Sequence, residues 1–151
     1  MVVHRNAVSS GPDPYEQAIE RLSLSLRGRI VRRGDDVYDA ARSIWNAAYA
    51  GSPALIVQPV DSQDVARAVA FARRHDLSIA VRSGGHGMAG HGTATGGLQI
   101  DLSLMKGIEI DPERRVARAE TGLTWPSTPV MRDSTAWRRP PETWAASGSV
   151  D

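Results

Sequence analysis

The feature that most restricts how this chain can fold is the stretch VRSGGHGMAGHGTATGG, residues 81–97. It contains seven of the fourteen glycines of the 151-residue protein. Glycine loses more conformational freedom on folding than any other residue, so this density needs a reason such as positive φ or a close backbone approach. Apolar runs of strand character flank the stretch on both sides. We therefore expect a glycine-rich loop between two strands, with a bare backbone that something else approaches closely.

A strand–helix–strand unit is predicted directly before the loop. PALIVQPV (53–60) and LSIAVRS (77–83) have the composition of buried strands. Between them, DSQDVARAVAFARRHD (61–76) has the apolar period of a helix, with Asp61 or Ser62 as its N-cap. Such a unit has a right-handed crossover, and we expect its two strands to pair in parallel. The buried stripe of the helix is expected to contain Val65, Ala68, Val69 and Ala72.

Two helices are predicted nearer the N-terminus. DPYEQAIERLSLSL (13–26) opens with Asp13 as a cap and Pro14 at the first helical position. DVYDAARSIWNAAYA (36–50) is predicted as a second helix. Its apolar stripe is expected to contain Val37, Ala40, Ala41, Ile44, Trp45 and Ala48.

The segments after the loop complete a fold of the α+β class with an α/β-like subdomain. GLQIDLSLM (97–105) is expected to contain a strand. KGIEIDPERRVARAET (106–121) is expected to form a hairpin that turns at Asp111-Pro112.

Charge and cysteine content exclude several classes of protein. Eighteen Lys+Arg against seventeen Asp+Glu leave a net charge of +1, which argues against a dedicated nucleic-acid binder. Without cysteine there is no disulfide, thiolate metal site or thiol nucleophile. No apolar run approaches the roughly 20 residues of a membrane span, and MVVHRNAVSS lacks the core of a secretory signal. We expect a soluble, cytoplasmic protein.

Two interpretations of the loop rest on familiar motifs. Gly85, Gly87 and Gly90 spell G-x-G-x-x-G, which binds a dinucleotide when a helix follows, but no helix is predicted here. His86 and His91, with Asp101 as a third ligand, could form the metal site of a hydrolase. Two histidines five residues apart on a loop share no fixed face, however, which weakens that interpretation.

A third interpretation is a nest of backbone N–H groups around a pyrophosphate. Gly84, Gly85 and Gly87 would allow the close approach and take positive φ. Arg82 could add positive charge or could simply face solvent at the strand end. Ser83 could donate its hydroxyl or merely cap the turn.

The stretch VRSGGHGMAGHG, with LIVQPVDSQDVARAVAFARRHDLSIA before it and GGLQIDLSLM after it, resembles the berberine-bridge-enzyme-like FAD-linked oxidoreductases of the vanillyl-alcohol-oxidase superfamily. The resemblance covers residues 35–125 and implies the first part of a PCMH-type FAD-binding domain, whose loop holds the pyrophosphate. It implies hydride transfer from a small-molecule substrate to flavin, with oxygen as the final acceptor. It also implies that His86 bonds covalently to the flavin, the alternative being a non-covalent hydrogen-bonding role. The cofactor-binding residues implied are Arg82, Ser83, Gly84, Gly85, His86, Gly87, Met88, Gly90 and His91.

The resemblance implies a partial FAD-binding domain over 35–125, preceded by a leader with a helix (1–34) and followed by a tail (126–151) of different composition. The tail holds four of the nine prolines and two of the four tryptophans and has no periodicity. We expect it to be disordered and to result from a shift of the reading frame. The substrate domain and its catalytic base would then be missing, so that the chain would not turn over alone. The alternative is a non-catalytic fragment that binds no cofactor.

Overall fold

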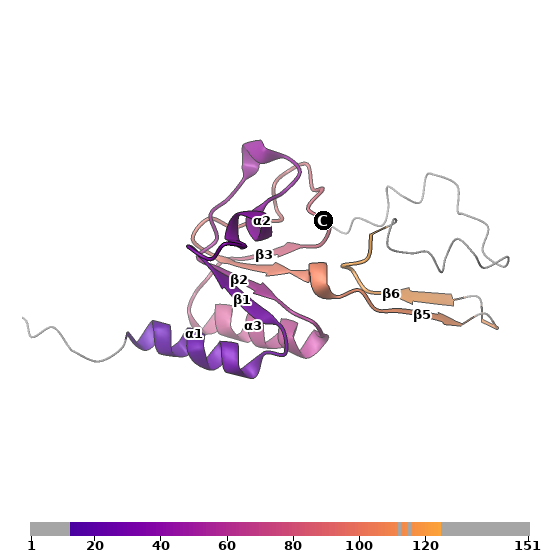
Figure 1. Ribbon diagram of the computed structural model, residues 1–151, viewed down its shortest axis with the longest axis horizontal. Coiled ribbons are helices and arrows are strands. Elements are labelled where there is room, and N and C mark those ends of the chain that lie inside the picture. The colour runs from indigo at the N-terminus through magenta and orange to yellow at the C-terminus, as the bar shows by residue number, and fades with distance from the viewer. Residues whose placement is uncertain (1–12, 112, 115, 125–151) are drawn as a thin grey trace, which may run out of the picture.

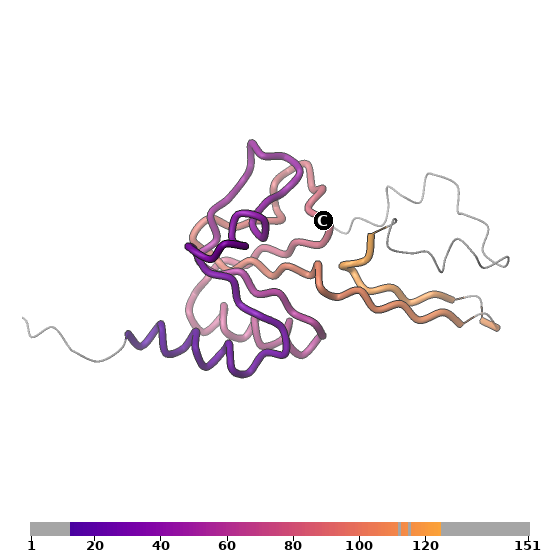
Figure 2. Tube along the Cα trace, viewed as in Figure 1, coloured from indigo at the N-terminus to yellow at the C-terminus, as the bar shows by residue number. Residues whose placement is uncertain are grey.

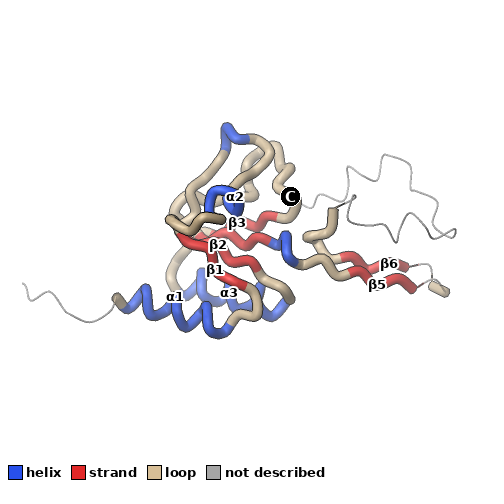
Figure 3. The backbone as a smooth tube through the Cα atoms, in the orientation of Figure 1, coloured by secondary structure: helices blue, strands red, loops and turns tan. Residues whose placement is uncertain are grey.

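The computed structural model describes residues 13–111, 113–114 and 116–124, so the predicted tail lies outside the described residues. A four-stranded sheet in the order β1-β2-β4-β3 forms its centre, and the hairpin β5–β6 projects from one end (Figures 1 and 3). The strands are β1 Arg29–Arg32, β2 Leu55–Gln58, β3 Ile79–Arg82, β4 Leu98–Asp101, β5 Ile108–Asp111 and β6 Val116–Ala119. The helices are α1 Pro14–Ser25, α2 Tyr38–Arg42 and α3 Ser62–Arg74, with 3-10 turns η1 Ala47–Tyr49 and η2 Leu102–Leu104. The expected α+β class is confirmed.

The predicted strand–helix–strand unit is present as β2–α3–β3, but its two strands are not neighbours. β4 lies between them and pairs with both in parallel, so the expected direct pairing of residues 53–60 with 77–83 is wrong. β1, which the sequence pattern does not predict, runs antiparallel on the other side of β2. β3 is therefore an edge strand, and its side chains Ile79 and Val81 remain partly exposed.

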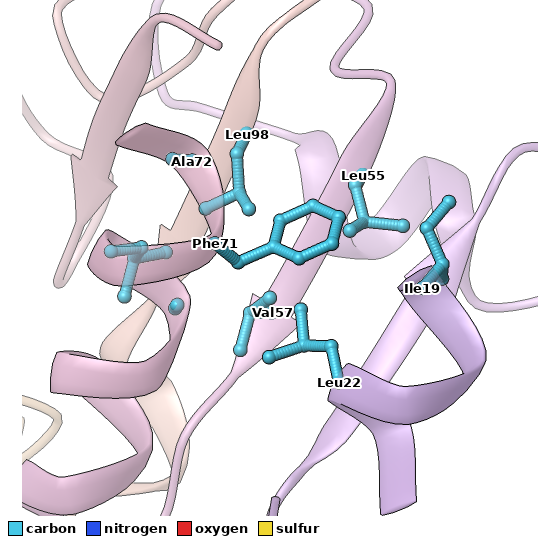
Figure 4. Close-up of a cluster of buried hydrophobic side chains, with 9 residues drawn as sticks. Ile19, Leu22, Leu55, Val57, Phe71, Ala72 and Leu98 are labelled. Carbon is cyan, nitrogen blue, oxygen red and sulfur yellow. The ribbon is translucent and has the colours of Figure 1, made fainter. Parts of the chain in front are cut away.

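One face of the sheet carries the main apolar core, formed with α1 and α3 (Figure 4). Asp13 caps α1 and Asp61 caps α3, each through its side chain as predicted. In α3, Ala68 and Ala72 are buried as expected, whereas Val65 and Val69 are only half-buried. The core comprises Ile19, Leu22, Leu55, Val57, Ala68, Phe71, Ala72, Leu98 and Ile100.

The opposite face is covered by α2 and two loops, residues 43–54 and 83–97 (Figure 1). The helix predicted over 36–50 ends at Arg42, because tertiary hydrogen bonds replace helical ones. The Trp45 N–H donates to the Gly85 carbonyl at 2.8 Å. The Ala41 carbonyl, which would otherwise accept it, accepts from Gln99 Nε2 at 2.9 Å.

The stripe predicted for that helix is correspondingly wrong. Ala41 and Ile44 are buried, but Val37 and Trp45 are 43% and 67% exposed. The predicted hairpin is confirmed: Ile108 pairs with Ala119 at its open end, and β5 ends at Asp111. Pro112 of the predicted turn lies outside the described residues. Among the described helices, none combines the length and apolarity that crossing a membrane requires.

Candidate functional site

The glycine-rich loop leaves the carboxyl end of β3 and returns to the start of β4 (Figure 2). Because β3 and β4 are parallel neighbours, this connection must run back along the sheet, a task usually given to a helix. Residues 83–97 contain no helix. The G-x-G-x-x-G interpretation therefore lacks the helix N-terminus that it requires. Ligands of open parallel sheets bind beyond the carboxyl ends of the strands, which is where this loop begins.

The packed half of the loop, residues 90–97, lies against other parts of the chain. A Cβ placed on Gly90 would lie 2.5 Å from the Cβ of Tyr49. A Cβ on Gly97 would overlap the carbonyl oxygen of Ser78. These glycines are needed so that the chain can pack against itself.

In the open half, residues 84–87, a Cβ on Gly85 would meet only ordinary contacts at 3.7 Å or more, and one on Gly84 would lie 3.1 Å from Nδ1 of the nearby His86. The four successive backbone N–H groups of this half have no hydrogen-bond acceptor within the described part of the chain. Of Gly84, Gly85 and Gly87, only Gly85 has positive φ (+72°), so the expectation is wrong for the other two. Unpaired N–H groups on a turn of this kind form a concavity suited to an anion.

A single contact sets the direction of this open half. The Gly85 carbonyl accepts from the Trp45 N–H at 2.8 Å. Across a trans peptide the carbonyl and the following N–H point in opposite directions, so the His86 N–H points away from Trp45. The orientation of the His86 amide, the third of the four, is thus set by a residue some forty positions earlier in the chain.

The side chains of His86, Met88 and His91 are exposed. The Nδ1 atom of His86 lies 3.1 Å from the position of a Cβ on Gly84, so the ring rests on the bare side of that glycine. The described residues contain no group of three His, Cys, Asp or Glu side chains placed to hold a metal. Asp101, the third ligand of the metal-site hypothesis, is fully buried in an ion pair instead.

Arg82, at the end of β3, does not face solvent. Its Cδ lies 3.7 Å from the position of a Cβ on Gly85, and its guanidinium bonds to other parts of the chain. Its Nε and Nη2 atoms donate to the two carboxylate oxygens of Asp101 at 3.2 and 2.8 Å. Its Nη1 atom donates to the carbonyls of Ser43 and Ala40. The side chain is 13% exposed, which excludes the solvent-facing alternative.

Ser83 joins the loop to the hairpin. Its hydroxyl donates to the carbonyl of Thr121, just beyond β6. The Gly122 N–H in turn donates to the Met105 carbonyl at 2.9 Å. The hairpin is therefore attached to the first residue of the loop.

Sequence reasoning misses the structural role of three buried polar residues, Gln58, Gln99 and Asp101. Their signal is present in the sequence, because Gln99 and Asp101 alternate with Leu98 and Ile100 along β4. A strand buried on both faces is normally a continuous apolar run, so polar residues at alternate positions indicate a polar network on one face.

Residues 53–128 fit the family model described as FAD binding domain. Over 100 residues the chain is 38% identical to (R)-6-hydroxynicotine oxidase of Paenarthrobacter nicotinovorans, covering 66% of this chain and 22% of that protein. It is 35% identical over 109 residues to an FAD-linked oxidoreductase of Dictyostelium discoideum, covering 72% and 24%. The chain thus spans less than a quarter of the length of these relatives.

Solved structures show the same fold. The crystal structure of 6-hydroxy-D-nicotine oxidase from Arthrobacter nicotinovorans superimposes with a TM-score of 0.62 at 38% identity, over 64% of this chain and 21% of that one. The xylooligosaccharide oxidase of Myceliophthora thermophila gives a TM-score of 0.63 at 22% identity, over 73% and 23%. The second likeness concerns the fold alone.

Proposed function

The chain belongs to the FAD binding domain family of the FAD-linked oxidoreductases. We therefore propose that the open half of the glycine-rich loop, residues 84–87, holds the pyrophosphate of FAD. The observation that carries this proposal is the row of four backbone N–H groups without an acceptor in the described chain. The positive φ of Gly85 supports it, because such a conformation turns successive amides toward one side. Amide dipoles, rather than a free side-chain cation, would meet the phosphate charge.

The activity proposed for the whole protein is oxidation of a small-molecule substrate. When bound, FAD supplies the acceptor for a hydride from the substrate and passes the electrons to oxygen. The part of this task that the chain's own residues perform is to bind and orient the cofactor. Since the chain spans under a quarter of its relatives, we propose that turnover needs the remaining length.

His86 is proposed as the residue that carries the flavin covalently. Its side chain is exposed within the open half, and neither ring nitrogen is hydrogen-bonded to another described residue. A nitrogen that is free of internal partners is available to form a bond. His91, on the packed half, is also exposed and serves as the matched comparison.

Titration of FAD onto the chain, followed by acid precipitation, tests both parts of the proposal. We expect saturable quenching of flavin fluorescence and a yellow precipitate. His86→Ala should release all flavin into the acid supernatant, whereas His91→Ala should retain it. If the parent chain binds FAD saturably but acid extracts all of the flavin, the flavin is not covalently bound, and His86 has the non-covalent role. A chain that shows no saturable binding at all would contradict the FAD proposal itself.

A further inference from the structure

A row of polar side chains crosses all four strands of the sheet on the face that carries α2. Arg29 Nε donates to Gln58 Oε1 at 2.6 Å, and Gln58 Nε2 donates to Asp101 Oδ2 at 2.6 Å. Arg82 completes the row through its two bonds to Asp101. Gln58, Arg82 and Asp101 are the last residues of β2, β3 and β4, so the row lies at the carboxyl end of the parallel strands.

Arg82 extends this row off the sheet toward the candidate site. Its Nη1 atom donates to the carbonyls of Ala40 and Ser43 at the end of α2. Two residues later, the Trp45 N–H donates to the Gly85 carbonyl. One guanidinium therefore fixes both the strand that leads into the open half and the segment that orients its peptide.

Stability alone does not account for this arrangement. Asp101 is fully buried, and a buried ion pair can usually be replaced by apolar residues of equal volume without loss of stability. What an apolar pair cannot do is bond to a carboxylate and two carbonyls at fixed angles. The planar guanidinium does this with its fork of five donors, and a lysine ammonium does not.

We propose that Arg82, held in place by Asp101, is a positioning residue that presets the open half of the loop for the cofactor. It acts through Ser43 and Trp45 on the Gly85 peptide, and not by pairing with a phosphate. The identity of the ligand rests on the function proposed above. The positioning itself is a property of the chain before any ligand binds.

The test is Arg82→Lys, which keeps the positive charge next to Asp101 but removes the planar guanidinium and its set of N–H donors. We expect the Trp45 amide to exchange with solvent about tenfold faster in the variant without FAD, because its partner carbonyl is no longer held in place. FAD affinity should fall by about tenfold as the open half loses its preset orientation. Amides of α3 should exchange as in the parent chain.

Arg29→Lys is the matched control, since it makes the same change at the far end of the row, away from the loop. It should alter neither Trp45 exchange nor FAD affinity by more than about twofold. Equal acceleration in both lysine variants would overturn the proposal, and so would an unchanged Trp45 amide in Arg82→Lys.

A second variant covers the case in which Arg82→Lys does not fold. Asp101→Asn leaves one oxygen to accept from Arg82 and should also accelerate Trp45 exchange, and an unchanged rate would overturn the proposal. If the parent chain binds no FAD while Trp45 exchange responds as expected, the proposed function fails and the positioning role stands.

Discussion

The two halves of the glycine-rich loop are alike in composition but use their glycines for different purposes. In the packed half (90–97), the chain fills the space that a side chain would need at Gly90, beside Tyr49, and at Gly97, beside Ser78. A Cβ on Gly92 would meet only ordinary contacts at 3.7 Å or more, and one on Gly96 nothing within 4 Å. In the open half (84–87), a Cβ on Gly85 would meet only ordinary contacts at 3.7 Å or more. The N–H groups of 84–87 are unpaired within the described chain, as are those of 88–92, whereas the Thr93 and Gly96 N–H groups of the packed half are hydrogen-bonded. Glycine density by itself therefore does not locate a ligand, because Gly90 and Gly97 are needed for packing.

The largest effect expected from this comparison is that of Gly97→Ala. Its methyl group would overlap a backbone carbonyl, that of Ser78, which cannot rotate away as a side chain can. The backbone must shift at the start of β4, and we expect the free energy of unfolding to fall by about 3 kcal/mol. Urea unfolding measures it. A loss of less than about 1 kcal/mol in the free energy of unfolding would mean that the packed half tolerates side chains, and it would contradict the distinction between the two halves.

Substitution of Asp64, at the start of α3, changes the stability of the fold at a position remote from the loop. Asp64 accepts hydrogen bonds from the N–H groups of Arg27, Gly28 and Val60 and from the Arg67 guanidinium. Burial of the carboxyl raises its pKa, but these four bonds together outweigh burial and hold the pKa below its ordinary value of 3.8. The ionised form is thus the one that stabilises the fold.

Two outcomes follow for Asp64. Because the folded pKa is depressed, its contribution is complete above the ordinary pKa and is lost as the pH falls through the folded value. Asp64→Asn should lower the free energy of unfolding by about 2 kcal/mol at neutral pH and flatten the acid limb of the pH–stability curve. Urea titrations between pH 7 and 2 measure both. FAD affinity of the folded variant should not change, and a parallel loss would mean that any destabilisation affects the open half.

Much of the architecture could be predicted from local patterns, because the deciding interactions lie close together in sequence. Asp61 caps α3 as its position before SQDV suggests, and LIVQ forms a strand. The helix over 36–50 could not be corrected from sequence, since its end at Arg42 depends on Gln99 and Gly85, which are distant in the chain. Long-range partners also decide that β4 inserts between β2 and β3.

The site was predictable in position but not in detail. Periodicity and the glycine-rich motif place it after β3, where the open half lies. Which glycines are needed for packing depends on Tyr49 and Ser78, and nothing local to the loop reveals these neighbours. The role of Arg82 was equally hidden, because its acceptors come from β4 and from α2.

A smaller effect is expected for Gly85→Ala, and it should appear mainly in binding. Alanine at φ +72° is strained, and the methyl would lie against Arg82 Cδ, Ile44 and Ser43 rather than in the space proposed for the anion. We expect a stability loss of about 1 kcal/mol. As φ relaxes, the His86 amide turns, and FAD affinity should fall by about tenfold. Fluorescence titration measures the affinity, and an unchanged value would contradict the role of the open half.

The smallest effect is expected for Gly96→Ala. This variant is the control for Gly85→Ala, because the two glycines have the same positive φ and an alanine at either position is equally strained. Gly96 has φ +73°, and a Cβ there would meet nothing within 4 Å. The stability loss should again be about 1 kcal/mol, since the conformational penalty depends on φ and not on the site. FAD affinity should be that of the parent chain, because Gly96 lies on the packed half and its N–H already donates to the Ser52 carbonyl at 3.0 Å. If Gly85→Ala and Gly96→Ala lose the same stability but only Gly85→Ala loses FAD affinity, FAD binding is assigned to residues 84–87. Equal losses of affinity would instead show that the loop responds to ligand as one unit.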